Sequence, residues 1–242
     1  MRKLLLAAVA AVVAALAIAG VASAIQGTQG LKVTATNKKA GTKEKPKSLG
    51  KFVVTTTTTP APGEPPFATS LAVISFDKNI VFGGKKFKSC SDTTGTTIDT
   101  TCKNAKVGGG SSTGVALGQT ENLTVTAYNG PKGNSIYLHV RGTAPLDINS
   151  VIVGSLKNGT GAYGKKLNVP IPANLQQPLA GVFATLTTFS TSVGGTSKDT
   201  PYVGLKGCPK DKKLKFKGDF TYTDGTKKTA TTTLKCTPAK KS

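Results

Sequence analysis

The chain contains one histidine, His139, so any mechanism that needs an imidazole must use this residue. In hydrolases with a Ser-His-Asp arrangement, a carboxylate orients the ring and the ring removes a proton from the nucleophilic hydroxyl. Asp147, a few residues further along, could orient His139 in this way. No G-x-S-x-G turn or other nucleophile motif accompanies it. Two interpretations therefore stand: a secreted hydrolase with an unrecognised site around His139, or a solvent-facing residue in the middle of a strand.

Other catalytic and metal-binding arrangements are weaker. Paired carboxylates could hydrolyse a glycoside without a histidine, but most acids here lie in turns or beside lysines, and no Trp is present to stack on a sugar. The segment 91–99 offers oxygen ligands but lacks the density of acids found in calcium-binding loops. No two cysteines have C-x2-C spacing, and His139 is far from all of them in sequence. We predict no catalytic residue, no metal and no cofactor.

Lysine dominates the charge of the chain, whose formal net charge is +21. One cluster occupies a loop over residues 37–50 and is offset by Glu44; its members are Lys38, Lys39, Lys43, Lys45 and Lys47. A second group lies within 206–217, where it partly follows strand alternation and could be the wet face of an amphipathic strand. Beyond Arg2 the only arginine is Arg141, although arginine is the usual residue for bidentate phosphate contacts. The pattern predicts attraction to an anionic cell-wall polymer or membrane surface, or plain solubility, and no specific nucleic-acid recognition.

The first residues predict an export signal. Met1, Arg2 and Lys3 form a short basic segment, an apolar run follows over 4–19, and the stretch ends with Ala22-Ser23-Ala24. Small residues in this A-x-A pattern are what a signal peptidase accepts, so we expect residues 1–24 to be removed. An uncleaved membrane anchor is the alternative, since the apolar stretch is nearly long enough to span a bilayer. Loss of Arg2 and Lys3 lowers the net charge by two, to +19.

Four cysteines remain, which in an exported chain are expected to form disulfides. Three pairings are possible. We favour Cys90–Cys102 and Cys208–Cys236, because each bridge then closes a local loop within one stretch of chain.

Short runs of β-branched and apolar residues recur along the chain, several of them with apolar residues at every second position, as is typical of half-buried strands. The clearest such runs are at 31–36, 52–59, 71–76, 122–128, 136–141, 148–156, 167–171, 182–189, 213–222 and 226–235. In the fifth run, His139 shares one face with Tyr137 and Arg141, and the apolar residues share the other. Residues 60–66 form a proline-rich break, 89–114 are interpreted as a loop, and 173–178 as a short helical turn.

These elements predict a single all-β domain over residues 25–242. The expected architecture is an antiparallel β-sandwich of the Ig-like or jelly-roll-like kind, with a partly closed barrel as the alternative. The pattern of strands does not specify their order in the sheets.

Several short motifs together resemble a group of uncharacterised secreted β-rich proteins of actinobacteria. Besides the export signal they are GTKEKPK at 41–47, KFKSC at 86–90, AKVGGG at 105–110, VPIP at 169–172, YVGLKGC at 202–208, FTYTDGT at 220–226 and TLKC at 233–236. The resemblance covers most of the chain and implies an extracellular β-rich domain with two disulfides. It brings no activity and no catalytic residue.

Three classes of function follow. The first is a non-enzymatic secreted β-protein that associates with the cell envelope or binds an extracellular polyanion. The second is the hydrolase around His139, which a pocket with converging acids or a hydroxyl would favour. The third is a structural or adhesive module of a surface assembly, which an exposed apolar patch or a free strand edge would favour. The ligand and the oligomeric state are not specified by the residues.

Overall fold

The structure is a computed structural model that describes residues 27–62 and 67–239. This part of the chain is all-β with antiparallel pairing throughout its sheets. Its strands are β1 (Thr28–Ala35), β2 (Lys47–Ser48), β3 (Phe52–Thr59), β4 (Thr69–Asp77), β5 (Ile80–Phe82), β6 (Lys106–Ala116), β7 (Gln119–Asn129), β8 (Ser135–Gly142), β9 (Ile148–Asn158), β10 (Tyr163–Pro170), β11 (Thr185–Val193), β12 (Thr196–Ser197), β13 (Thr200–Pro201), β14 (Val203–Leu205), β15 (Lys213–Tyr222) and β16 (Lys227–Lys235). The helices are α1 (Ile98–Thr101) and α2 (Ala173–Gln176), with 3-10 turns η1 (Gly84–Lys86), η2 (Lys103–Ala105) and η3 (Pro131–Gly133).

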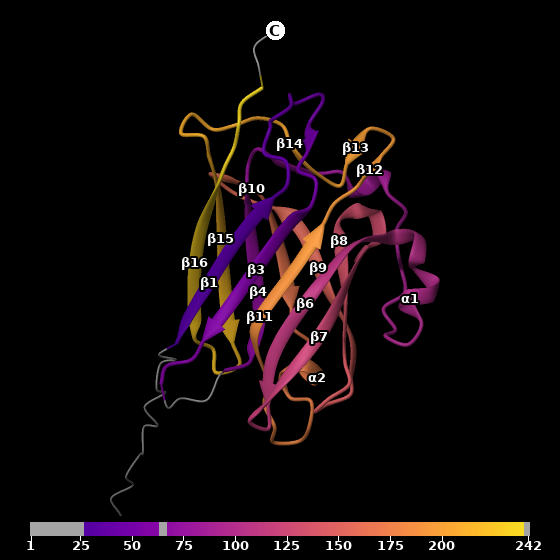
Figure 1. Cartoon of the computed structure of the whole chain (residues 1–242), viewed down its shortest axis with the longest axis vertical. Coiled ribbons are helices and arrows are strands. Elements are labelled where there is room, and N and C mark those ends of the chain that lie inside the picture. Colours follow the sequence, from indigo (N-terminus) through magenta and orange to yellow (C-terminus); the bar gives the residue numbers. More distant parts are fainter. Residues whose placement is uncertain (1–26, 63–66, 240–242) are drawn as a thin grey trace, which may run out of the picture.

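One eleven-stranded sheet forms the body of the molecule, in the order β1-β3-β11-β6-β7-β8-β9-β10-β4-β15-β16. The sheet curls until its two edge strands, β1 and β16, lie side by side (Figure 1). Just beyond these strands the backbone closes the ring, because Ala40 N donates to Thr237 O at 2.8 Å and Thr237 N donates to Lys38 O at 2.8 Å. The sheet is therefore a nearly closed barrel.

The all-β antiparallel class is confirmed, and the sheet is barrel-like and not clearly the predicted sandwich. A sandwich needs two sheets with separate edges, whereas here one hydrogen-bonded series of eleven strands runs around the body until its two edges lie side by side. Alternation of apolar residues is the same in both architectures, because either one buries a single face of every strand. The partly closed barrel, weighed as the alternative, describes the molecule better.

Alternation places the core inside the barrel. On β15, Leu214, Phe216, Phe220 and Tyr222 are all buried, as their shared face predicts. The ring of Phe216 lies 6.1 Å from that of Phe52 on β3 and 6.3 Å from that of Phe76 on β4, measured between centroids. Strands that are distant in sequence are thus joined by aromatic packing across the barrel interior.

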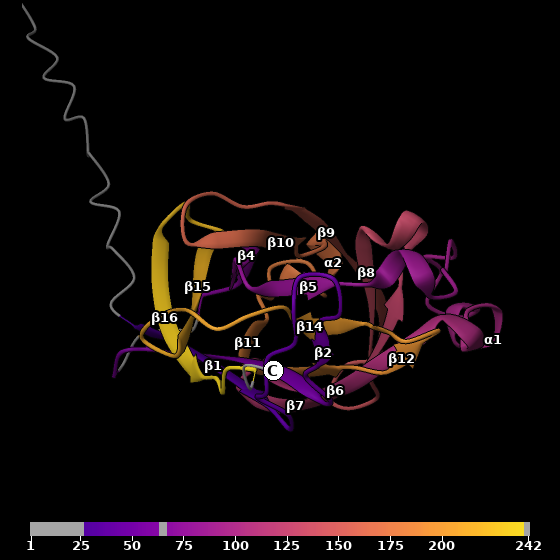
Figure 2. The same ribbon diagram turned by 90° about the horizontal axis from the view of Figure 1, so that it is seen from above.

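A three-stranded sheet, β2-β14-β5, covers one end of the barrel, and we call it the cap sheet. Seen from above, these strands lie within the ring formed by the barrel strands (Figure 2). The cap sheet and its flanks bury Leu49, Ile80, Val203 and Leu205 in the same core cluster as the barrel residues. The cap sheet is therefore part of the folded core and not a peripheral flap.

The loop interpretation of 89–114 is correct only in its first part, because β6 begins at Lys106. The missed strand contains Gly108, Gly109 and Gly110, which supply no apolar alternation. The neighbouring strand β11 approaches so closely that an added Cβ would lie 1.9 Å from Ser192 O at Gly108 and 1.9 Å from Ser190 O at Gly110. Glycine is needed here for a close approach of two backbones.

Both predicted disulfides are present. Cys90 pairs with Cys102 at a Cα–Cα distance of 5.1 Å, and Cys208 pairs with Cys236 at 6.0 Å. They are consistent with an extracellular protein. The short helical turn predicted at 173–178 is observed as α2. The predicted export signal over 1–24 and part of the proline-rich break, residues 63–66, lie outside the described residues.

Candidate functional site

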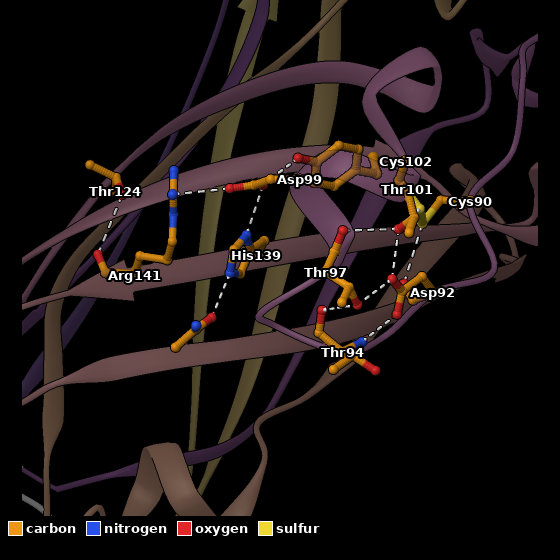
Figure 3. A network of polar contacts seen from close by, with 12 residues as sticks. Cys90, Asp92, Thr94, Thr97, Asp99, Thr101, Cys102, Thr124, His139 and Arg141 are labelled. Atoms are coloured by element: carbon orange, nitrogen blue, oxygen red, sulfur yellow. Dashed lines mark hydrogen bonds and ion pairs between the residues drawn. A yellow bond between two sulfur atoms is a disulfide. The ribbon is translucent and has the colours of Figure 1, made fainter.

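The outer face of the barrel carries a polar network beneath the Cys90–Cys102 loop (Figure 3). Asp99 on α1 is at its centre: His139 Nδ1 lies 2.9 Å from its Oδ1, and Arg141 Nη1 lies 3.0 Å from its Oδ2. The hydroxyl of Tyr128, on the adjacent strand β7, also donates to Oδ1 of Asp99. One carboxylate on the loop thus binds three side chains of the barrel wall.

His139 is buried, with 1% of its surface exposed, so its interpretation as a solvent-facing strand residue is wrong. The strand face was predicted correctly, but the disulfide loop covers that face and packs Ile98, Tyr128 and Tyr137 into a second apolar cluster. Asp147, the proposed orienting acid, is exposed and is not hydrogen-bonded to His139. Asp99, forty residues before His139, takes that place.

Both nitrogens of the His139 ring are engaged. Nδ1 faces Asp99, and Nε2 lies 2.8 Å from Oδ1 of Asn149 on β9. Either orientation of the Asn149 amide leaves Nε2 hydrogen-bonded, so both ring nitrogens already have protein partners. Among the described residues, no Ser or Thr hydroxyl is bonded to the ring. This geometry gives His139 a structural task, which is to hold the disulfide loop against the barrel.

Electrostatics of the network favour a charged Asp99. Burial acts to raise its pKa, but hydrogen bonds from Tyr128 and His139, together with electrostatic attraction to His139 and Arg141, outweigh burial and lower the pKa below its usual value. Burial and the neighbouring Asp99 raise the pKa of Tyr128, so its hydroxyl remains a donor at neutral pH. The two groups stabilise each other in their opposite roles of acceptor and donor.

A second carboxylate holds the same loop together internally. Asp92 accepts hydrogen bonds from the Thr101 hydroxyl at 2.6 Å, the Thr97 hydroxyl at 2.7 Å and the Thr94 backbone N–H at 2.8 Å. These donors, with Thr101 first, lower the pKa of Asp92 to about 2. The short helix α1 is therefore fixed by the disulfide and by Asp92, and it carries Asp99 in a defined position.

The lysines predicted as a polyanion site lie at the capped end of the barrel. All five, Lys38, Lys39, Lys43, Lys45 and Lys47, are exposed. Their loop is firmly attached, because Gly41 N donates to Leu205 O at 2.9 Å and Leu49 N donates to Val203 O at 3.1 Å. None of them forms an ion pair with a described carboxylate.

The second lysine group meets the first at this end. Thr237 N bonds to Lys38 O, and the preceding residue donates from Cys236 N to Lys212 O at 2.9 Å, so the two segments lie against one another. We call this surface the lysine end, and it comprises Lys38, Lys39, Lys43, Lys45, Lys47, Lys206, Lys210, Lys212 and Lys213. Further along β15, Lys217 leaves the group and pairs with Asp219 at 2.7 Å. The amphipathic-strand interpretation accounts for Lys215 and Lys217, which lie on β15 outside the lysine end.

The opposite end of the barrel has a different character. Its described turns and connections, 60–62, 67–68, 117–118, 143–147, 171–184 and 223–226, contain no lysine, although β16 begins beside the last of them with Lys227 and Lys228. Large apolar side chains are exposed there instead: Leu117 by 56%, Phe183 by 56% and Leu179 by 48%. We call these three residues the apolar tip. Three side chains fall well short of a stable protein interface, which buries about 800 Å² on each partner.

Two further features of the described residues bear on metal binding and membrane insertion. Residues 27–62 and 67–239 contain no group of three or more His, Cys, Asp or Glu side chains placed to hold a metal ion. No helix in this part of the chain is long and apolar enough to cross a membrane.

Comparison of the chain with protein-family models, with curated proteins and with solved structures gives no match. The resemblance to secreted actinobacterial proteins therefore has no support from these comparisons. Of what it implied, the structure shows the two disulfides. Any functional inference must rest on the geometry described above.

Proposed function

We propose that this protein is a non-enzymatic secreted β-barrel that binds an anionic polymer of the cell envelope through its lysine end. The observation that carries the proposal is the meeting of two lysine-rich segments, distant in sequence, on one end of the barrel. The loop lysines form no ion pair with a described acid, and Glu44 and Asp211 offset only part of the positive charge at this end.

The attachment of loop 37–50 supports this function physically. Binding to a flexible loop would cost the entropy of ordering its backbone. Here hydrogen bonds to β14 and to Thr237 already hold the backbone, so a polymer needs to order only the lysine side chains. Lysines act as mobile point charges and suit a polymer with repeated negative charges better than one fixed phosphate.

A polymer is favoured over a lipid bilayer by the distribution of apolar residues. Stable association with a bilayer uses apolar side chains or lipid chains as well as basic residues. The described large apolar side chains that are exposed, Leu117, Leu179 and Phe183, lie at the end opposite the lysines. The lysine end therefore offers charge without a group for insertion.

Retention on immobilised polyphosphate across a salt series tests the proposal. Binding should weaken steeply with salt, because exposed charges are screened within ~8 Å at physiological ionic strength. Replacement of Lys38, Lys39, Lys43, Lys45 and Lys47 by Gln should shift elution to lower salt without loss of folding. Vesicles that contain phosphatidylglycerol form a second arm, and stronger binding to vesicles than to polyphosphate would redirect the proposal to membranes.

A charge-matched variant provides the control. Lys32, Lys103, Lys106, Lys132 and Lys227 are exposed and lie outside the lysine end. Their replacement by Gln removes the same charge, so net charge alone would weaken binding equally in both variants. Equal weakening, or no retention of the wild type at low salt, would remove the lysine end as a binding site.

Export is part of this proposal and has its own test. Cleavage after Ala24 would start the secreted protein at Ile25. N-terminal sequencing of protein from culture medium should find Ile25, and an intact Met1 in the membrane fraction would favour the anchor instead.

A further inference from the structure

The interior of the barrel is not filled. A cavity of about 150 Å³ lies between the inner faces of the barrel strands and extends to Phe82 and Tyr202 under the cap sheet. Its wall is made mainly of alternate residues, such as Val54 on β3, Leu167 on β10 and Phe189 on β11. These inward side chains are only half-buried, which for the inner face of a barrel reflects the empty space beside them.

The number of strands explains why the space exists. A barrel of about eight strands has an interior just wide enough for side chains to fill, and larger barrels enclose a ligand cavity or channel. Here eleven strands surround the interior, and the small residue Ala72 is among those that line the cavity. The central aromatic cluster of Phe52, Phe76 and Phe216 fills only part of the width.

The cavity is long and narrow. Along β3 its lining runs from Phe52 to Thr58, which corresponds to about 20 Å at ~3.3 Å per residue. A dry apolar cavity of about 150 Å³ can hold a molecule as small as benzene. Spread over the length of β3, the same volume suits a single hydrocarbon chain better than a fused ring system.

One end of the cavity is polar. Gln29 on β1, Thr58 on β3 and Thr69 on β4 line it where these strands begin or end. The Oε1 atom of Gln29 accepts hydrogen bonds from Thr58 Oγ1 at 2.9 Å and from Tyr222 OH at 2.7 Å. These bonds fix the amide, and its Nε2 makes no hydrogen bond to another described residue, which leaves a donor for a polar end group.

We propose that this cavity is a binding site for a slender amphiphile, a molecule with one hydrocarbon chain and a hydroxyl or carboxylate at its end. The chain lies among the apolar side chains of the interior, and the polar end reaches Gln29. Few convergent polar groups at one end of an apolar cavity are the usual design of such sites, since the apolar wall supplies affinity and the polar groups orient the ligand. The site is separate from the lysine end and does not depend on the polymer proposal.

Two adjacent valines on β3 make a matched test. Val54 lines the cavity and pairs with the buried Val33, whereas Val53 points to the outer face and pairs with the exposed Thr34. Val54→Phe should fill the cavity, and Val53→Phe adds the same volume outside it. Isothermal titration calorimetry with decan-1-ol and with decanoate, both below their aggregation concentrations, measures binding to each protein.

The wild type should bind one molecule of decan-1-ol or decanoate with a negative heat-capacity change, the mark of apolar burial. Val54→Phe should weaken binding at least about tenfold, equal to about 1.4 kcal/mol, and Val53→Phe should stay within about twofold. If Val54→Phe does not give a native circular-dichroism spectrum, Ala72→Leu replaces it with the same expectation. Absence of saturable binding to the wild type, or equal weakening by the inner and outer variants, would overturn the proposal.

The neutral alcohol separates this site from the charged surface. Decanoate could bind lysines through its charge, but decan-1-ol has no charge. The variant with five loop lysines replaced by Gln should bind decan-1-ol as the wild type does. Binding of decanoate alone, lost in that lysine variant, would assign the ligand to the surface and overturn the cavity site.

Discussion

Replacement of Asp99 by Ala should release the disulfide loop from the barrel. In the wild type the carboxylate accepts bonds from Tyr128 and His139, which are 2% and 1% exposed, and from the half-exposed Arg141. The variant leaves the two buried groups without their acceptor. A buried polar group that loses its partner costs about 1–3 kcal/mol.

The expected loss follows from these contacts. Tyr128 and His139 each contribute such a penalty, while the Arg141 pair contributes little because exposed ion pairs are worth less than about 1 kcal/mol. Water can enter the space left by Asp99, whose side chain is 35% exposed, and will replace part of the hydrogen bonds that Tyr128 and His139 lose. We therefore expect the free energy of unfolding to fall by about 2–4 kcal/mol.

Guanidinium unfolding of Asp99→Ala, with Asp147→Ala as the control, measures this effect. Asp147 is exposed and outside the network, so its variant should stay within about 0.5 kcal/mol of the wild type. Hydrogen exchange should also accelerate at Cys102 N–H, which donates to Ile98 O within α1. A loss below about 1 kcal/mol for Asp99→Ala, or an equal loss for Asp147→Ala, would refute the assignment of Asp99 as the anchor.

Three further predictions concern stability. Phe216→Ala should lower the free energy of unfolding by about 3–5 kcal/mol in urea titrations, because its fully buried ring joins three strands; a loss typical of a surface site would contradict that packing. Burial raises the pKa of Tyr222 from 10.0 to about 12, so the unfolded chain releases its phenolic proton first and the free energy of unfolding should fall between pH 10 and pH 12. In Tyr222→Phe the denaturant midpoint should depend less on pH over this range, and a pH profile equal to that of the wild type would count against the raised pKa. Replacing Cys208 and Cys236 together by Ser should cost about 3.6 kcal/mol in the chain-entropy model, measured by thermal unfolding, and peptide mapping of the wild type should show no bridge from either to Cys90 or Cys102.

The strands were predictable because alternation is a local signal. The inner face of β15 and the two faces of β8 follow from the sequence, since one buried face of a sheet demands every second residue to be apolar. Closure of the barrel is not local. It depends on β1 and β16, from opposite ends of the chain, lying side by side, and no residue pattern within either strand records that neighbour. β6 was missed for a related reason, since Gly108 and Gly110 serve a backbone approach from β11.

The polar network shows the same limit. His139 was singled out because it is the only histidine, and the pairing of Cys90 with Cys102 was predicted from sequence separation. The direction in which the disulfide loop folds cannot be predicted from sequence separation. Proximity in sequence therefore favours Asp147 as the partner of His139, whereas Asp99 is its partner in space. The loop lysines were recognisable as a cluster, but their meeting with the segment around Lys212 depends on hydrogen bonds at Thr237 and Cys236. The cavity could not be predicted from amino-acid composition, because the residues that line it are of the same types as those of the filled core.

The lysine end and the apolar tip lie at opposite ends of the barrel, so an anionic layer that bound the first would leave the second pointing away from it. An adsorbed barrel would therefore stand upright, with the cap sheet toward the layer. The eleven residues of β7, at ~3.3 Å each, would then act as a spacer that holds Leu117 and Phe183 roughly 30 Å above it. A population of such molecules would turn a negatively charged surface into one that displays the same apolar contact point at a uniform height.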